Sequence, residues 1–232
     1  MFVISACSAC YADEVQSLLD FYIREFKPET ALLTISEQPD NTGLIQEVYM
    51  ELDGVVIENL RLNKLVFQMQ GAQFNSPSEW EKGKVECKSA MYVNAIANLL
   101  ERDINKAIEE KTFGDGDHWH DVHLRINAKG LSGKGYYQAM GLDILLEIDS
   151  GLKIVKGKEL WLKDPNVKVN RLEVPDYLTK KALSDIQPLI DLNEFPLPLT
   201  IKDIELKEGS ATLKTRRMPQ KPANGIVYRY EK

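Results

Sequence analysis

The feature that most constrains the fold of this chain is an alternation of apolar and polar side chains between Val122 and Val174. Because successive side chains of a β-strand point to opposite faces, a two-residue period predicts strands with one buried face. Glycines lie between these runs at hairpin spacing, which favours antiparallel pairing. The runs are 122–128, 142–148, 152–154, 160–162, 167–169 and 172–174, and the glycines are Gly130, Gly133, Gly141, Gly151 and Gly157.

Two other segments repeat apolar residues at helical spacing. One covers 13–27 and is followed by Pro28, which stops a helix. The other begins after Pro175 and continues to about residue 190, with Pro188 in its last turn. Its apolar stripe includes Leu178, Ala182, Ile186 and Leu189.

The segment 85–108 is ambiguous, because its apolar residues fit a strand in the first half and a helix in the second. β-Branched and small residues precede Leu99, and good helix formers follow it. We therefore expect a long strand to about Leu99 and a helix over 101–111.

Shorter alternating runs predict further strands over 31–35, 48–52 and 60–69, with a turn at Asp53-Gly54. After the last helix, Leu197, Leu199 and Ile201 alternate with polar residues, and the phase slips near Asp203. Such a slip is typical of a β-bulge, and Glu208-Gly209 then predicts a hairpin turn. Many strands with three helices among them indicate an α+β fold in which a curled antiparallel sheet covers its apolar face with helices.

Composition limits the function. The chain has 232 residues, 44% hydrophobic and 28% charged, which indicates a soluble globular protein with a sizeable core. A net charge of -6 and a pI near 5.3 argue against a nucleic-acid partner. Four basic residues near the C-terminus fit either a solvated tail or a contact with anionic lipid head groups at roughly 1 kcal/mol each. They are Lys214, Arg216, Arg217 and Lys221.

Residues 1–12 resemble the remains of an export signal. Cys10-Tyr11-Ala12 before Asp13 is similar to a signal-peptidase site, and Ile4-Ser5-Ala6-Cys7 is similar to a lipoprotein box in which Cys7 is lipidated. An ordinary N-terminus with an incidental CxxC remains the alternative, because a basic region and enough apolar length are lacking.

The best catalytic or metal-binding candidate is the stretch 115–123, which contains all three histidines. Asp117, His118 and His120 supply ligand types that zinc and other transition metals accept. On a strand, His118 and His120 would share one face and His123 would point to the other. The alternative is a turn followed by histidines on the wet face of a strand, and we favour it. The sequence has no phosphate loop, nucleophile elbow or HExxH motif, so we expect neither an enzyme nor a cofactor.

The order of these patterns resembles the LmeA-like family of bacterial cell-envelope phospholipid-binding proteins. Three places carry the resemblance, which covers roughly 13–216. They are the Asp-hydrophobic-Asn signature Asp103-Ile104-Asn105, the tandem strands of 122–174, and the segment Pro188-Leu189-Ile190-Asp191 with Phe195-Pro196-Leu197-Pro198-Leu199 and the turn at Glu208-Gly209. The histidine stretch and the tail after Arg217 lie outside the pattern.

This resemblance implies an exported protein of the periplasm or cell envelope, with a single domain over 13–216 and a tail over 217–232. It also implies a fold similar to the tubular lipid-binding proteins, in which a long curved antiparallel sheet wraps around amphipathic helices and leaves an apolar groove for acyl chains. Each buried methylene is worth about 0.8 kcal/mol, so a 16-carbon chain gains roughly 12 kcal/mol before ordering costs. We expect the groove to be lined by Met91, Val93, Ile126, Leu142, Ile144, Leu146, Leu178, Ala182 and Ile186.

The predicted function is non-enzymatic binding of a phospholipid or similar amphiphile. One alternative is a structural module whose apolar face meets a protein partner. The other is a metal-dependent enzyme built on Asp117, His118 and His120. Plain core packing remains the alternative role of each lining residue.

Overall fold

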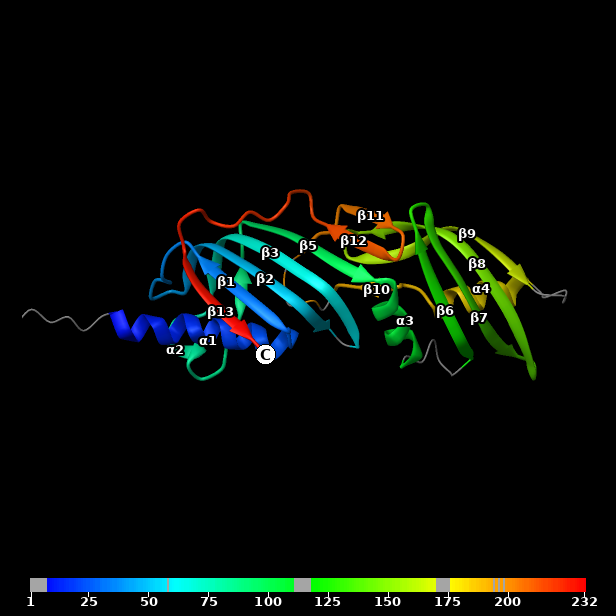
Figure 1. Cartoon of the computed structure of the whole chain (residues 1–232), viewed down its shortest axis with the longest axis horizontal. Helices are drawn as coiled ribbons and strands as arrows, with labels where there is room; N and C mark the ends of the chain where they lie inside the picture. The colour runs from blue at the N-terminus through cyan, green and yellow to red at the C-terminus, as the bar shows by residue number, and fades with distance from the viewer. Residues whose placement is uncertain are drawn as a thin grey trace, which may run out of the picture. The chain divides into compact units, whose positions relative to one another are not determined.

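The computed structural model describes residues 8–57, 59–110, 118–169, 176–193, 195, 197 and 199–232. The contacts group the chain into two compact units. Unit 1 comprises Met1–Ile57, Asn63–Ala97 and Arg217–Lys232, and unit 2 comprises Glu58–Leu62 and Asn98–Arg216. Each unit is an antiparallel sheet with helices, so the chain is an α+β protein in which strands predominate (Figure 1).

Unit 1 contains most of the stretch β5-β3-β2-β1-β13 of an eight-stranded sheet, and β4 also pairs with β3. Helix α1 packs on this sheet, with the rings of Tyr22 and Phe67 5.5 Å apart. The helix ends where Lys27 adopts a positive φ of 44° before Pro28. The elements are α1 (Ser8–Phe26), β1 (Thr30–Ile35), β2 (Leu44–Ile57), β3 (Leu60–Phe74), α2 (Pro77–Trp80), β4 (Cys87–Ser89), β5 (Tyr92–Leu100) and β13 (Ile226–Glu231).

Two predictions for unit 1 are wrong. The segment 217–232 is not a free tail, because its last strand β13 pairs with β1 over Thr30↔Glu231 to Ile35↔Ile226. Asp53-Gly54 is not a turn, because β2 runs through it. Gly54 has a φ of 65°, and a Cβ there would lie 2.4 Å from the Glu29 side chain, so glycine is needed for local geometry.

Unit 2 contains a five-stranded sheet with the order β10-β9-β8-β7-β6 and the hairpin β11-β12. The predicted alternation over 122–169 is confirmed as four consecutive antiparallel strands, whereas 172–174 lie outside the described residues. The elements are α3 (Glu101–Glu109), β6 (Trp119–Asn127), β7 (Gly130–Ala139), β8 (Leu142–Val155), β9 (Glu159–Val169), α4 (Asp176–Asp185), β10 (Ile190–Asp191), β11 (Asp203–Lys207) and β12 (Ser210–Lys214).

The helix expected to reach about residue 190 ends at Asp185. Pro188 disfavours the helical conformation of the residue before it, and the chain then forms β10 against β9. The alternation at Leu197, Leu199 and Ile201 buries these side chains without forming a strand, and β11 begins at Asp203, where we expected a bulge.

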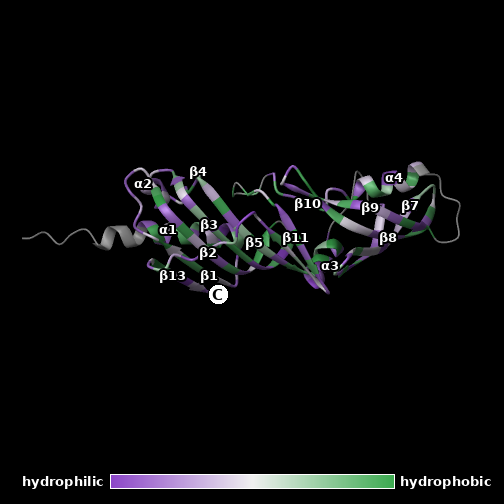
Figure 2. Ribbon diagram, turned by 90° about the horizontal axis from the view of Figure 1, so that it is seen from above, coloured by the Kyte–Doolittle hydropathy of each residue, from purple (hydrophilic) through white to green (hydrophobic). Residues whose placement is uncertain are grey.

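The glycines of unit 2 have two roles. Gly141 and Gly157 lie in turns with positive φ, as their hairpin spacing predicted. Gly133 and Gly151 lie within strands instead. Figure 2 shows hydrophilic and hydrophobic residues alternating along the strands, which gives each sheet a face for its core.

Candidate functional site

The apolar cluster of unit 2 is the candidate binding site, because it gathers residues that the sequence assigned to a lipid groove. Ile126 of β6, Ile144 and Leu146 of β8 and Ala182 of α4 are all buried in it, and Ile186 is half-buried against it. The other buried members are Trp119, Leu131, Tyr137, Ile148, Leu162 and Ala211. Sheet and helix therefore meet over one continuous apolar surface.

Helix α4 covers this cluster and has few polar links to the sheet among the described residues. Ala182 is fully buried and Leu178 is 8% exposed. Near the end of the helix, the Tyr137 hydroxyl donates a hydrogen bond of 3.2 Å to the Asp185 carboxylate. Just beyond it, the Gln187 side chain accepts a hydrogen bond of 3.2 Å from the Leu162 backbone.

The Tyr137–Asp185 contact also affects ionisation. Burial raises the pKa of Tyr137, and the nearby Asp185 carboxylate raises that pKa further. Tyr137 is 3% exposed and therefore stays protonated near neutral pH, where it can donate to Asp185.

Helix α3 supports the edge of the same sheet through polar side chains. The Asn105 amide accepts a hydrogen bond from the Leu124 backbone N–H and donates one to its carbonyl, both at 2.8 Å. Glu101 accepts a 2.7 Å hydrogen bond from the Ile126 backbone N–H. These bonds satisfy the β6 backbone in place of another strand.

Asp103 of α3 pairs with a residue that lies far away in the sequence. Its carboxylate pairs with the Arg61 guanidinium at 3.1 Å, and no side-chain cap bond is made at the helix start. The roles of Asp103 and Asn105 were missed because spacing alone cannot reveal partners 42 and 19 residues away.

Four of the nine predicted lining residues do not belong to the cluster, and one of them is Leu178, which is buried on α4 but is not a member. Leu142 begins β8 and is 52% exposed. Met91 is 73% exposed and lies, with the half-buried Val93, in unit 1. Met91 and Val93 were grouped with the others because we expected one curled sheet.

His120 and His123 are both exposed on β6, as the favoured interpretation predicted, whereas the expectation that they point to opposite faces is wrong. A β-bulge in β6 places two residues, Asp121 and Val122, opposite the single residue Gly135 of β7. Asp121 has a φ of 52°. The extra residue shifts the alternation of side chains by one position. His120 and His123 therefore point to the same face, where both are exposed. His118 precedes β6 and lies against the Tyr137 ring at 5.8 Å.

His120 lies between two carboxylates on the surface. Its ring stacks on Tyr136 at 5.2 Å, and its nitrogens lie 3.2 Å from Asp121 and 3.3 Å from Asp143. Hydrogen bonds to Asp121 and then Asp143 raise the pKa of His120. Among the described residues no group of three His, Cys, Asp or Glu side chains could hold a metal ion, and Asp117 lies outside them.

The basic residues near the C-terminus are divided between the two units. Lys214 and Arg216 belong to unit 2, where Lys214 pairs with Glu205. Arg217 and Lys221 are exposed residues of unit 1.

Comparisons with known proteins add no assignment. No family model matches the chain, and no curated protein or solved structure matches it. Among the described helices, none has the length and apolar character needed to cross a membrane.

Proposed function

We propose that this protein binds a phospholipid or similar amphiphile without catalysing a reaction, and that the acyl chain lies between α4 and the sheet of unit 2. The observation that carries the proposal is the gathering of Ile126, Ile144, Leu146 and Ala182 from three elements into one apolar cluster. In this proposal the sheet and its helices form a fold similar to the tubular lipid-binding proteins. The protein acts in the cell envelope after export.

A comparison of burial energies favours α4 as the element that an acyl chain displaces from the sheet. On α4, burial of Leu178 contributes about 1.5–3 kcal/mol, whereas the fully buried Ala182 adds only a methyl group worth about 0.8 kcal/mol. An acyl chain of 16 carbons gains roughly 12 kcal/mol before ordering costs, so it can offset the loss of contacts between α4 and the sheet. The lipid then completes the core that the helix covers.

The test is native mass spectrometry with organic extraction, on protein purified without detergent from a bacterial lysate that contains membranes. We expect about one phospholipid per chain. Ile186→Gln places a polar amide at the half-buried edge of the cluster and should lower lipid occupancy roughly tenfold.

The matched control is Ile23→Gln, which changes a half-buried isoleucine on α1 in unit 1. It should leave lipid occupancy unchanged. A lipid-free mass for the wild-type chain, or equal loss of lipid in both variants, would refute the proposal.

A second candidate function is a protein-interaction module. The tip of the β7–β8 hairpin exposes Met140 by 70% and Leu142 by 52%. Large apolar side chains at a turn are candidates for a partner contact. A lipid-free chain that self-associates, and that becomes monomeric on Met140→Ser with Leu142→Ser, would favour this function.

A further inference from the structure

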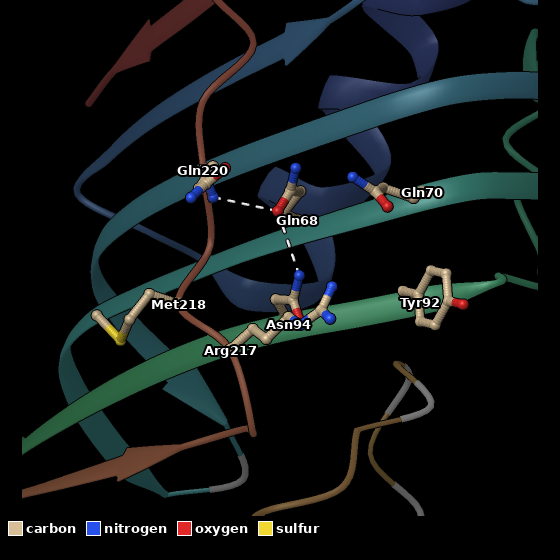
Figure 3. Close-up of a pocket in the computed structure, with 7 residues that line it drawn as sticks. All are labelled: Gln68, Gln70, Tyr92, Asn94, Arg217, Met218 and Gln220. Atoms are coloured by element: carbon tan, nitrogen blue, oxygen red, sulfur yellow. Dashed lines mark hydrogen bonds between the residues drawn. The ribbon is translucent and has the colours of Figure 1, made fainter.

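A polar groove of about 470 Å³ lies on unit 1, within the size range of small-molecule sites. Two strands form its floor, and the irregular segment 217–220 forms one wall (Figure 3). The lining residues are Gln68 and Gln70 of β3, Tyr92 and Asn94 of β5, and Arg217, Met218 and Gln220 of the wall.

Gln68 holds the groove together. It is 4% exposed, and its side-chain oxygen accepts hydrogen bonds from the Asn94 amide at 3.3 Å and from the Gln220 backbone N–H at 3.1 Å. One buried amide therefore joins β3, β5 and the wall, as Figure 3 shows. Leaving such a group unpaired would cost about 1–3 kcal/mol, so the wall is fixed in place.

The wall is further constrained along the chain. Pro219 and Pro222 restrict its backbone, and β13 anchors the following residues to β1. The groove is thus formed before any ligand arrives, which lowers the entropic cost of binding.

The lining chemistry selects the ligand. Side-chain amides both donate and accept hydrogen bonds, which matches a ligand rich in hydroxyl groups. The Gln70 amide is oriented by a 3.2 Å hydrogen bond to Glu47. Tyr92 is 58% exposed and offers both an aromatic face and a hydroxyl.

Other ligand classes fit less well. An acyl chain would leave the amides of Gln70 and Asn94 facing a hydrocarbon, which is costly. A polyphosphate or nucleic acid needs several cations, and Arg217 alone carries a full positive charge among the seven described lining residues.

We propose that the groove of unit 1 binds a short oligosaccharide, with one sugar ring stacked on Tyr92 and its hydroxyl groups bonded to Asn94, Gln70 and Gln220. Arg217 at the wall accommodates at most one acidic group on the sugar. This site is independent of the acyl-chain site proposed in unit 2.

The first experiment screens the purified full chain on a glycan array and measures the hits by isothermal titration calorimetry. Tyr92→Leu removes the aromatic face and should weaken binding at least roughly tenfold. Tyr92→Phe keeps the ring and should retain most of the affinity. Both substitutions of Tyr92 should be tolerated by the fold, because this side chain is more than half exposed.

The matched control is Tyr177→Leu, a tyrosine of unit 2 that is 60% exposed. It should bind the same glycans as the wild type. Three results would each overturn the proposal: no glycan binds, Tyr92→Leu binds as well as Tyr177→Leu, or non-glycosylated peptides bind with equal affinity.

Discussion

Helices α1 and α4 pack on sheets of similar character but contribute differently to their units. The apolar face of α1 carries Val15, Leu18, Leu19, Tyr22 and Phe26, and each of these is at most 1% exposed. On α4, Ala182 is fully buried and Leu178 is 8% exposed, whereas Leu183 and, just after the helix, Ile186 are only partly buried.

The aromatic residues increase this contrast. In unit 1 the ring of Tyr22 contacts Phe67 and stacks on Phe26 at 5.9 Å, so the helix is interlocked with the sheet. The face of α4 is aliphatic and small, and its main polar link to the sheet in the described residues is the Tyr137–Asp185 hydrogen bond. The difference teaches that α1 belongs to a closed core, whereas α4 is suited to act as a removable cover.

The largest predicted effect is the difference between a leucine-to-alanine substitution on α1 and the same substitution on α4. Leu18→Ala opens a cavity at a fully buried site and should lower the free energy of unfolding by about 3–5 kcal/mol. Leu183→Ala removes a partly buried side chain and should cost less than about 2 kcal/mol. Urea unfolding monitored by circular dichroism measures both, and equal losses would remove the distinction between core helix and cover.

A medium effect is expected where α3 meets β6. Asn105→Ala removes both hydrogen bonds to the Leu124 backbone and should destabilise unit 2 by about 1–3 kcal/mol. The amide hydrogen of Leu124 should then exchange faster. Asn193→Ala is the control, because that exposed side chain donates to Asp191 at 2.7 Å and to Glu159 at 3.5 Å without bonding to a strand backbone, and it should change stability by less than about 0.5 kcal/mol.

Contrary results would change the role of α3. If Asn105→Ala and Asn193→Ala had equal effects, α3 would not support the edge of β6. The helix would then resemble α4 rather than α1 in its contribution to stability.

The smallest effect concerns the link between α4 and the sheet. Tyr137→Phe removes the hydrogen bond to Asp185 and should cost about 0.5–1.5 kcal/mol. The folded-state pKa of Tyr137 lies above its ordinary value of 10.0, so its contribution is fully present below pH 10. That contribution is lost as the pH rises through the folded-state pKa.

Unfolding measured across alkaline pH checks this prediction. The wild type should lose stability above pH 10 more steeply than Tyr137→Phe. Tyr49 of unit 1 is the internal comparison, because it is present in both proteins and its pKa is also raised, to about 12, by burial and then by Glu51. If the wild type and Tyr137→Phe lost stability equally with rising pH, the hydrogen bond of Tyr137 would not contribute to holding α4.

Local periodicity predicted much of the fold. The strands over 122–169 and the helices α1 and α3 follow from the spacing of apolar residues, because burial of one face is a property of the local pattern. The end of α4 was placed too late, since Leu189 and Ile190 continue the apolar stripe past the point where Pro188 ends the helix.

The candidate site was predictable only in part. Ile126, Ile144, Leu146 and Ala182 lie in one cluster because each lies on the buried face of a regular element, and their role in lipid binding stays a prediction. The face of His123 was mispredicted because a bulge adds one residue to β6 after His120, and the apolar alternation that begins at Val122 is unbroken and shows no slip there.

The sequence by itself determined most of the long strands and helices and which face of each is apolar, because those properties depend on neighbours a few residues apart. Only the tertiary structure decided that the chain forms two units, that β13 completes the first sheet, and that Gln68 bonds to Gln220, which lies 152 residues away. Such pairings depend on which surfaces meet in space, and the spacing of residues along the chain does not specify them.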